Sequence, residues 1–137
     1  MKEYVKFANE NKTSFFATVD ESGQPRVRAL GFWYADETGF YFQTATMKDL
    51  YKQLKNNSKA EACFFNPNDN VMMRVTGDVE FFDTKEARER VMKDRPFLRD
   101  LGLSEDSLEL IMYRIAHGSA YFWTMATNLE GKKIMKF

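Results

Sequence analysis

The chain has 137 residues, 20 basic and 20 acidic side chains, and a formal net charge of +0. This length predicts a single domain over residues 1–137, and the balanced charge excludes a global field that would attract nucleic acid or an anionic membrane. The single cysteine, Cys63, excludes an internal disulfide. Because Cys and His clusters are also absent, we expect a cytoplasmic protein without a metal site.

Residues 1–11 predict a short amphipathic helix, because Tyr4, Phe7 and Ala8 recur there at helical spacing. This segment lacks the apolar core of a signal peptide, and no later window approaches the ~18 apolar residues of a membrane span. We therefore expect a chain that is neither exported nor inserted into a membrane.

Two β-hairpins follow in the prediction. Residues 14–20 and 26–35 are rich in β-branched and aromatic side chains, and the Gly- and Pro-containing segment 21–25 between them is typical of a turn. Residues 36–39 form a second turn, after which residues 40–44 run back along the preceding strand.

The hydrophobic period then changes to that of a helix over residues 46–57. Thr46 is a good N-cap, and Asp49 stands three residues later, as in a capping box. Residues 59–66 and 70–83 return to strand character and predict a further hairpin.

The last third of the chain continues the alternation of strands and helices. Gly77 inside its strand predicts a bulge or a close backbone approach. A helix is expected over residues 84–94 with Thr84 as N-cap, and residues 104–114 are expected to begin another helical turn or two with Ser104 as cap. Strand character resumes over residues 115–125, and a short last strand is expected near the end of the chain.

About six strands, mostly joined by hairpins, therefore alternate with a few helices. This order predicts a mainly β protein, a six-stranded antiparallel barrel with peripheral helices, because closure of the sheet removes exposed strand edges.

A local anion site is predicted on the strand 26–35. Side chains alternate along a strand, so Arg26 and Arg28 share one face while Val27 and Ala29 share the other. The small residues of the second face would let a flat ligand approach the backbone. The hairpin partner would bring two hydrogen-bonding side chains, Gln43 and Thr44, back towards the arginines.

The helix that follows extends this site. Its first amides lack intrahelical partners, and helix N-termini bind phosphates for that reason. Lys48 is expected in the first turn, so the arginines, Lys48 and free amides could hold one phosphate. Asp49 would compete for the same helix dipole. The alternative is a solvated strand face with ordinary surface ion pairs.

The order of three segments resembles the pyridoxamine 5′-phosphate oxidase-like family of flavin-binding split β-barrels. These are ATVDESGQPRVRALGFWYADETGFYFQT, MKDLYKQLKNNSKAEACFF and MRVTGDVEFFD, and the later AYFWTM resembles the closing strand of short members. The resemblance implies a six-stranded split barrel that forms a homodimer, with FMN bound at the subunit interface.

Carried over residue by residue, the resemblance implies a set of cofactor contacts, which includes the positions reached above from charge and alternation. The set comprises Arg26, Val27, Arg28, Ala29, Gln43, Thr44, Lys48 and Trp123. Trp123 is implied by the resemblance alone. Met47 stands where vitamin B6 oxidases usually carry a second basic residue, and their arginine-rich C-terminal segment is absent. The nitroimidazole-reductase-like subgroup is therefore the closer likeness, and oxidation of a B6 vitamer is not expected.

Three other positions have both a structural and a functional interpretation. His117, the only histidine, could transfer protons or ligate haem, but a single strand histidine is more often a hydrogen-bonded core or interface residue. Cys63 is expected to be buried and unreactive. Arg74 could line the site of a partner subunit or simply face solvent.

The leading hypothesis is an FMN-binding oxidoreductase that passes electrons from a reduced nicotinamide to a small organic acceptor. The flavin would carry the redox chemistry while the protein binds and orients it. The first alternative is a module that binds or stores a flavin, a deazaflavin or haem without turnover. The second is a dimeric interaction protein whose arginines meet an acidic partner.

Overall fold

The computed structural model describes all residues from 1 to 137. The elements in chain order are α1 (Lys2–Glu10), β1 (Thr13–Val19), β2 (Pro25–Gly31), β3 (Tyr34–Asp36), β4 (Gly39–Ala45), α2 (Asp49–Asn56), β5 (Lys59–Asn66), β6 (Val71–Phe82), α3 (Lys85–Asp94), a 3-10 helix η1 (Pro96–Leu101), β7 (Leu110–Thr124) and β8 (Met135–Lys136).

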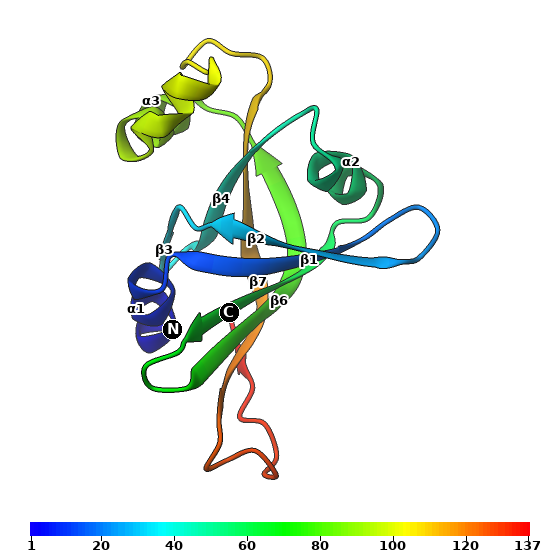
Figure 1. Ribbon diagram of the computed structural model, residues 1–137, viewed down its shortest axis with the longest axis vertical. Coiled ribbons are helices and arrows are strands. Elements are labelled where there is room, and N and C mark those ends of the chain that lie inside the picture. Colours follow the sequence, from blue (N-terminus) through cyan, green and yellow to red (C-terminus); the bar gives the residue numbers. More distant parts are fainter.

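All strands belong to one antiparallel sheet in the order β2-β1-β5-β6-β7-β4-β3, with β8 paired to β7. The sheet curls around its core as an open barrel, with α1 and α2 beside it and α3 at one end (Figure 1). The predicted mainly β, antiparallel split barrel with peripheral helices is confirmed. Six strands have seven or more residues, as expected, and β3 and β8 add three and two residues.

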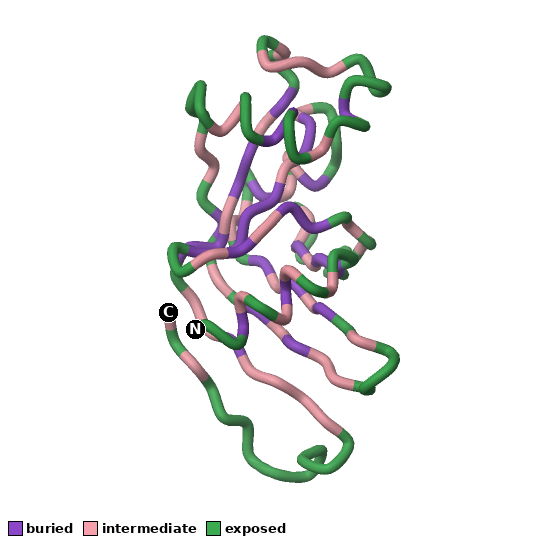
Figure 2. Tube along the Cα trace, turned by 90° about the vertical axis from the view of Figure 1, so that its left-hand side faces the viewer, coloured by how far each residue is buried: buried purple, intermediate pink, exposed green.

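The inner face of the sheet encloses the main core, a cluster of 18 buried residues to which α1 and α2 also contribute. Aromatic rings dominate it: Phe42 stacks on Tyr113 at 5.2 Å between ring centroids, and Phe16 meets Phe42 edge-on at 5.0 Å. Figure 2 shows buried positions gathered at the centre of the trace and exposed ones in the loops. This packing stabilises the barrel from inside.

A second, smaller cluster of seven buried residues lies on the other side of β4 and β7, beneath α3 and η1. It includes Tyr41, Leu110 and Met112 from the strands and Val91 and Met92 from α3. The predicted helix with Thr84 as N-cap is confirmed, since the Thr84 hydroxyl accepts a hydrogen bond from the Ala87 amide at 3.1 Å. Both faces of β7 are therefore covered along its first half.

The helix predicted over residues 104–114 is wrong, because β7 begins at Leu110. Leu110 and Met112 face the small cluster, while Tyr113 and Ile115 face the barrel core. A strand buried on both faces carries no alternation of apolar and polar residues, so its sequence pattern resembles that of a helix.

The long strand predicted over residues 26–35 is interrupted between β2 and β3. Phe32 and Trp33 are both buried, and their carbonyl groups bond to side chains instead of a neighbouring strand. Arg95 Nη1 donates to the Phe32 carbonyl at 2.9 Å, and Lys12 Nζ donates to the Trp33 carbonyl at 2.7 Å. These two cations satisfy the backbone where the sheet ladder stops.

The irregularity predicted at Gly77 is confirmed. The register between β6 and β7 shifts between Gly77 and Val79, so that two residues of β7, Ala116 and His117, lie opposite Asp78. A Cβ atom on Gly77 would lie 2.5 Å from the His117 carbonyl oxygen. Only glycine permits this approach of the two strands. No helix of the chain combines the length and apolar composition needed to cross a membrane.

Candidate functional site

The predicted alternation along β2 is confirmed by its pairing with β1. Arg26 lies opposite Thr18 and Arg28 opposite Phe16, so both arginines follow the inner face of the sheet. Val27 is 69% exposed on the outer face, and Ala29 is exposed beside it. Because β2 is the edge strand of the sheet, a ligand can approach it from both sides.

Arg28 is a half-buried cation that is held by neutral groups. Its Nη1 donates to the Thr18 hydroxyl at 2.8 Å and its Nη2 donates to Gln53 Oε1 on α2 at 2.8 Å. Burial lowers the pKa of the Arg28 guanidinium below its ordinary value, and the residue forms no salt bridge. Its charge therefore remains available to an anion.

Arg26 differs from Arg28 because it already has a carboxylate partner. Arg26 Nε donates to Asp20 Oδ2 at 3.0 Å in the turn of the β1–β2 hairpin. The pKa of Asp20 is lowered to about 2, first by the Ser22 hydroxyl and then by the backbone amide of Gln24 and by Arg26. An anion that binds Arg26 must share it with Asp20.

The two arginines face α2 across a cavity of about 560 Å³. Lys52 and Gln53 of α2 line it, together with Asp49 at the start of that helix. Sequence reasoning missed Lys52 and Gln53. They come close to the arginines through the packing of α2 against the barrel, which local spacing does not encode.

The start of α2 differs from the prediction. The helix begins at Asp49 with Lys48 as N-cap, so Thr46 as the cap and Lys48 in the first turn are wrong. Lys48 is exposed and its side chain is absent from the lining of the cavity between β2 and α2. The amides of the first turn remain close to that cavity, because Asp49 lines it.

Gln43 and Thr44 do not lie beside β2 in the sheet. Residues 40–45 of β4 pair with β7, and residues 39–41 pair with β3, so the predicted return of this segment along residues 26–30 is wrong. Thr44 is 1% exposed, and its Oγ1 atom has no hydrogen-bond partner. Gln43 is half-buried and follows the opposite face of β4.

Trp123 lies far from β2 along the sheet. Trp123 is on β7 and pairs with Met72 of β6. Four strand spacings separate β7 from β2, which amounts to roughly 19 Å along the sheet. Its Nε1 donates to Asn128 Oδ1 at 2.8 Å, so the indole orientation is fixed by the loop that follows β7. Within one chain, Trp123 and Val27 therefore lie on strands separated by three others along the sheet.

The outer face between these two ends carries a row of mostly apolar and aromatic side chains with one arginine. Ala29, Phe15, Cys63, Arg74 and Tyr121 are successive partners across β2, β1, β5, β6 and β7. Phe15 is 45% exposed, and Arg74 is paired with a carboxylate of β5. Burial raises the pKa of the Cys63 thiol, which opposes a reactive role. Cys63 is only half-buried, less than expected.

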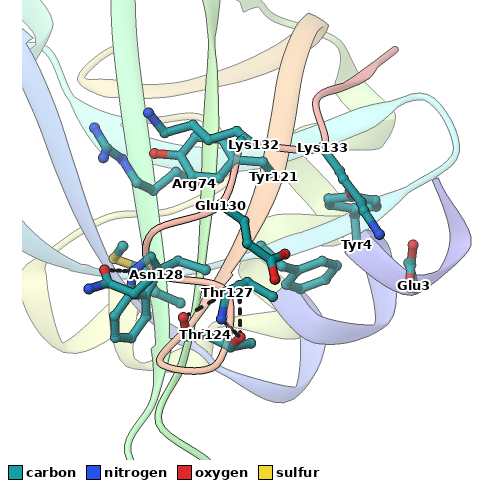
Figure 3. A pocket seen from close by; sticks show the side chains of 14 residues that line it. Glu3, Tyr4, Arg74, Tyr121, Thr124, Thr127, Asn128, Glu130, Lys132 and Lys133 are labelled. Carbon is teal, nitrogen blue, oxygen red and sulfur yellow. Dashed lines mark hydrogen bonds between the residues drawn. The ribbon is translucent and has the colours of Figure 1, made fainter.

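A second cavity, of about 730 Å³, opens beside Trp123, between the end of β7, the following loop and the start of α1 (Figure 3). Arg74, Tyr121 and Lys132 lie at one end of it. Sequence reasoning singled out Trp123 and Arg74 but did not predict that they line one cavity, because its walls come from segments far apart in the chain. His117 is exposed at the bulge and lines neither cavity.

Comparison with known proteins agrees with the fold. Residues 1–104 match the family model described as pyridoxamine 5′-phosphate oxidase. The chain is 33% identical over 93 residues to a pyridoxine/pyridoxamine 5′-phosphate oxidase of Burkholderia mallei, covering 68% of this chain and 43% of that enzyme. The chain thus spans less than half the length of the curated relatives it matches.

Solved structures extend the similarity to the full chain. A NimC/NimA family protein from Clostridium acetobutylicum is 25% identical, with a TM-score of 0.84 over 100% of this chain and 93% of that one. The haem storage protein HutZ from Vibrio cholerae shares the fold at 16% identity and a TM-score of 0.66, covering 84% of this chain and 87% of its own.

Proposed function

Because the chain belongs to the pyridoxamine 5′-phosphate oxidase family, we propose that it binds FMN and acts as an oxidoreductase. In this proposal it passes electrons from a reduced nicotinamide to a small organic acceptor. When bound, the flavin supplies the electron-transfer chemistry, and the chain binds it, orients it and limits the access of water.

The observation that carries this proposal is the position of Arg28. A half-buried cation without a salt bridge lies at the edge of a sheet whose other face exposes Val27 and Ala29. A ligand that suits both features has an anionic end and a flat apolar end, as FMN does. The first amides of α2 and Lys52 add to the anionic end.

The residues proposed to contact FMN follow from this arrangement. Arg28 binds the phosphate, and Arg26 and Lys52 line the same cavity. Lys48, at the N-cap of α2, makes no ion pair and extends its side chain to the phosphate. The backbone from Val27 to Ala29 lies along the ring system. Gln43 and Thr44 remain proposed contacts of the polar edge, as the family resemblance implies.

We further propose that the protein is a homodimer, because the site is incomplete within one chain. The family resemblance implies that Trp123 contacts the flavin, and Trp123 lies roughly 19 Å along the sheet from β2, so in this proposal the indole comes from a second copy. The outer face offers an apolar surface for that copy, with Phe15 and Phe65 45% and 39% exposed.

The phosphate contact is tested by comparing FMN with riboflavin, using quenching of flavin fluorescence. One charge-assisted hydrogen bond contributes roughly 1.5–3 kcal/mol, so Arg28→Met should weaken FMN binding about ten-fold or more and leave riboflavin nearly unchanged. Arg99→Met, which removes an exposed arginine of η1, is the matched control. Equal losses for FMN and riboflavin would show that Arg28 does not bind the phosphate. Wild-type protein that binds no FMN would overturn the proposal.

A module that binds flavin, deazaflavin or haem without turnover is the second candidate. Its support is the fold that the chain shares with the haem storage protein HutZ, and because His117 lines neither cavity a flavin suits these cavities better than haem does. Anaerobic addition of NADH or NADPH separates the two functions. An oxidoreductase loses the absorbance of its oxidised flavin with at least one donor, whereas a storage module keeps it with both.

A further inference from the structure

Gln53 of α2 joins the helix to the two strands that carry Thr18 and Arg28. Its Oε1 atom accepts two hydrogen bonds, one from the Thr18 hydroxyl at 2.6 Å and one from Arg28 Nη2 at 2.8 Å. Arg28 Nη1 also donates to the Thr18 hydroxyl, at 2.8 Å. The three side chains therefore form a closed ring of hydrogen bonds between β1, β2 and α2.

This ring fixes the orientation of the Gln53 amide. A glutamine side chain has one acceptor oxygen and one NH2 group with two donors. In the reversed orientation the NH2 group would face Arg28 Nη2, which is also a donor, and the bonds that Oε1 accepts would be lost. Gln53 lines the cavity between β2 and α2, so its Nε2 atom, which bonds to neither Thr18 nor Arg28, has two donors available to a ligand there.

The acceptors that hold Arg28 are all neutral. They are the Thr18 hydroxyl, Gln53 Oε1 and, at 3.3 Å, the backbone carbonyl of Phe16. Neutral acceptors orient a guanidinium group without cancelling its charge, whereas a carboxylate at the position of Gln53 would form an ion pair with it. The amide of Gln53 thus leaves the positive charge of Arg28 to be met by a ligand.

We infer that Gln53 determines the preference of this cavity for a phosphorylated ligand. Through Oε1 it is a positioning residue for Arg28, and through Nε2 it donates a hydrogen bond to the phosphate. The inference rests on the proposed function for the identity of the ligand as FMN. The ring of hydrogen bonds and the available amide donors belong to the chain itself.

The contact is tested by NMR of the side-chain amide of Gln53, whose pair of proton–nitrogen signals is identified by its loss in Gln53→Met. FMN and inorganic phosphate should both shift this pair, riboflavin should shift it less, and the amide of Asn68, in the exposed β5–β6 turn, should not move. Equal shifts with FMN and riboflavin, or no shift with either FMN or phosphate, would overturn the inference. If phosphate shifts the pair but FMN does not bind, the proposed function fails and the inference stands.

Two variants separate this role from a merely structural one. Gln53→Glu retains an acceptor for Thr18 and Arg28 but pairs the guanidinium with a carboxylate, so the ratio of FMN affinity to riboflavin affinity should fall about ten-fold or more. Gln53→Met leaves Arg28 charged and should lower the same ratio only a few-fold. Denaturation by urea should show the opposite order of stability, because Gln53→Met removes the acceptor of two hydrogen bonds.

The matched control is Asn68→Asp, which makes the same change from amide to carboxylate in an exposed turn and should alter neither the affinity ratio nor the signals of Gln53. If Gln53 only supports the fold, Gln53→Met should lower the ratio at least as much as Gln53→Glu does. That order, or an unchanged ratio in Gln53→Glu, would contradict the inference.

Discussion

The inner and outer faces of the sheet are built from the same strands but differ in what they bury. On β5, Phe64 lies fully buried in the barrel core while its neighbour Phe65 is 39% exposed. The inner face is closed by aromatic packing and by α1 and α2. The outer face from β2 to β7 keeps apolar groups beside charged ones. Burial on one face specifies the fold, and exposure on the other leaves a surface for a ligand or a second copy.

The largest expected effect is a difference in the loss of unfolding free energy between substitutions of Phe64 and of Phe65. Phe64→Ala should lower the free energy of unfolding by about 3–5 kcal/mol, because it removes a ring from a packed core and leaves a cavity. Phe65→Ala should cost less than about 1 kcal/mol, as for other partly exposed side chains. Denaturation by urea at a protomer concentration low enough to keep the protein monomeric measures both, because a lost dimer contact would otherwise add to the loss for Phe65→Ala.

The same pair of variants tests the proposed dimer. Phe65→Ala should raise the dissociation constant of the dimer, measured by analytical ultracentrifugation, because it removes apolar surface from the outer face. Similar losses of unfolding free energy for both variants would contradict the distinction between the faces. An unchanged monomer–dimer equilibrium would instead exclude Phe65 from the interface.

A smaller effect concerns two tyrosines on the two sides of the β4–β7 pair. The hydroxyl of Tyr113 is buried in the barrel without a hydrogen-bond partner, and burial raises its pKa. The hydroxyl of Tyr41, on the side covered by α3, bonds with Thr38 at 2.6 Å and accepts from Arg114 at 3.1 Å. Tyr113→Phe should therefore stabilise the protein by about 1 kcal/mol, and Tyr41→Phe should destabilise it by about the same amount.

Thermal and urea denaturation of these two variants provides the measurement, and each tyrosine serves as the control for the other. Destabilisation by Tyr113→Phe would show that its hydroxyl has a partner, such as a buried water molecule. Binding of FMN should be unchanged by both substitutions, since neither hydroxyl lines the cavity between β2 and α2.

Sequence reasoning succeeded where one face of a strand is solvated. On β2, the alternation of Arg26 and Arg28 with Val27 and Ala29 predicted both faces correctly, because an edge strand retains the two-residue period. It failed at β7, where both faces are buried and the pattern resembles a helix. It also failed at Phe32 and Trp33, where hydrogen bonds from the side chains of Arg95 and Lys12 replace the backbone hydrogen bonds of the sheet.

The residues around the cavity between β2 and α2 could be predicted from the sequence only in part. Arg26 and Arg28 could be assigned to one face from local spacing alone. Their neighbours Lys52 and Gln53, on α2, come close only because the helix packs across the end of the barrel. Contacts of this kind depend on tertiary packing, which a period of two or of 3.6 residues does not encode.

The smallest expected effect is a change in the pH dependence of stability, and it concerns the turn of the β1–β2 hairpin. Asp20 has its pKa lowered from 3.8 to about 2 by Ser22, Gln24 and Arg26. A carboxyl whose pKa is lower in the folded state stabilises the protein above its unfolded pKa, and this contribution is lost as the pH falls through the folded value. The wild type should therefore lose stability between pH 3.8 and about pH 2, and Asp20→Asn should lose less over that range.

The same substitution releases Arg26 from its carboxylate partner. Asp20→Asn should then bind FMN a few times more tightly than the wild type at neutral pH, because one negative charge leaves the cavity and riboflavin gains nothing from the change. Asp69→Asn, in the turn of the β5–β6 hairpin, is the matched control for both measurements. Weaker FMN binding by Asp20→Asn would show that Asp20 positions Arg26 for the phosphate. Phosphate binding on the inner face of β2 would then depend on the hairpin turn as well as on Arg28.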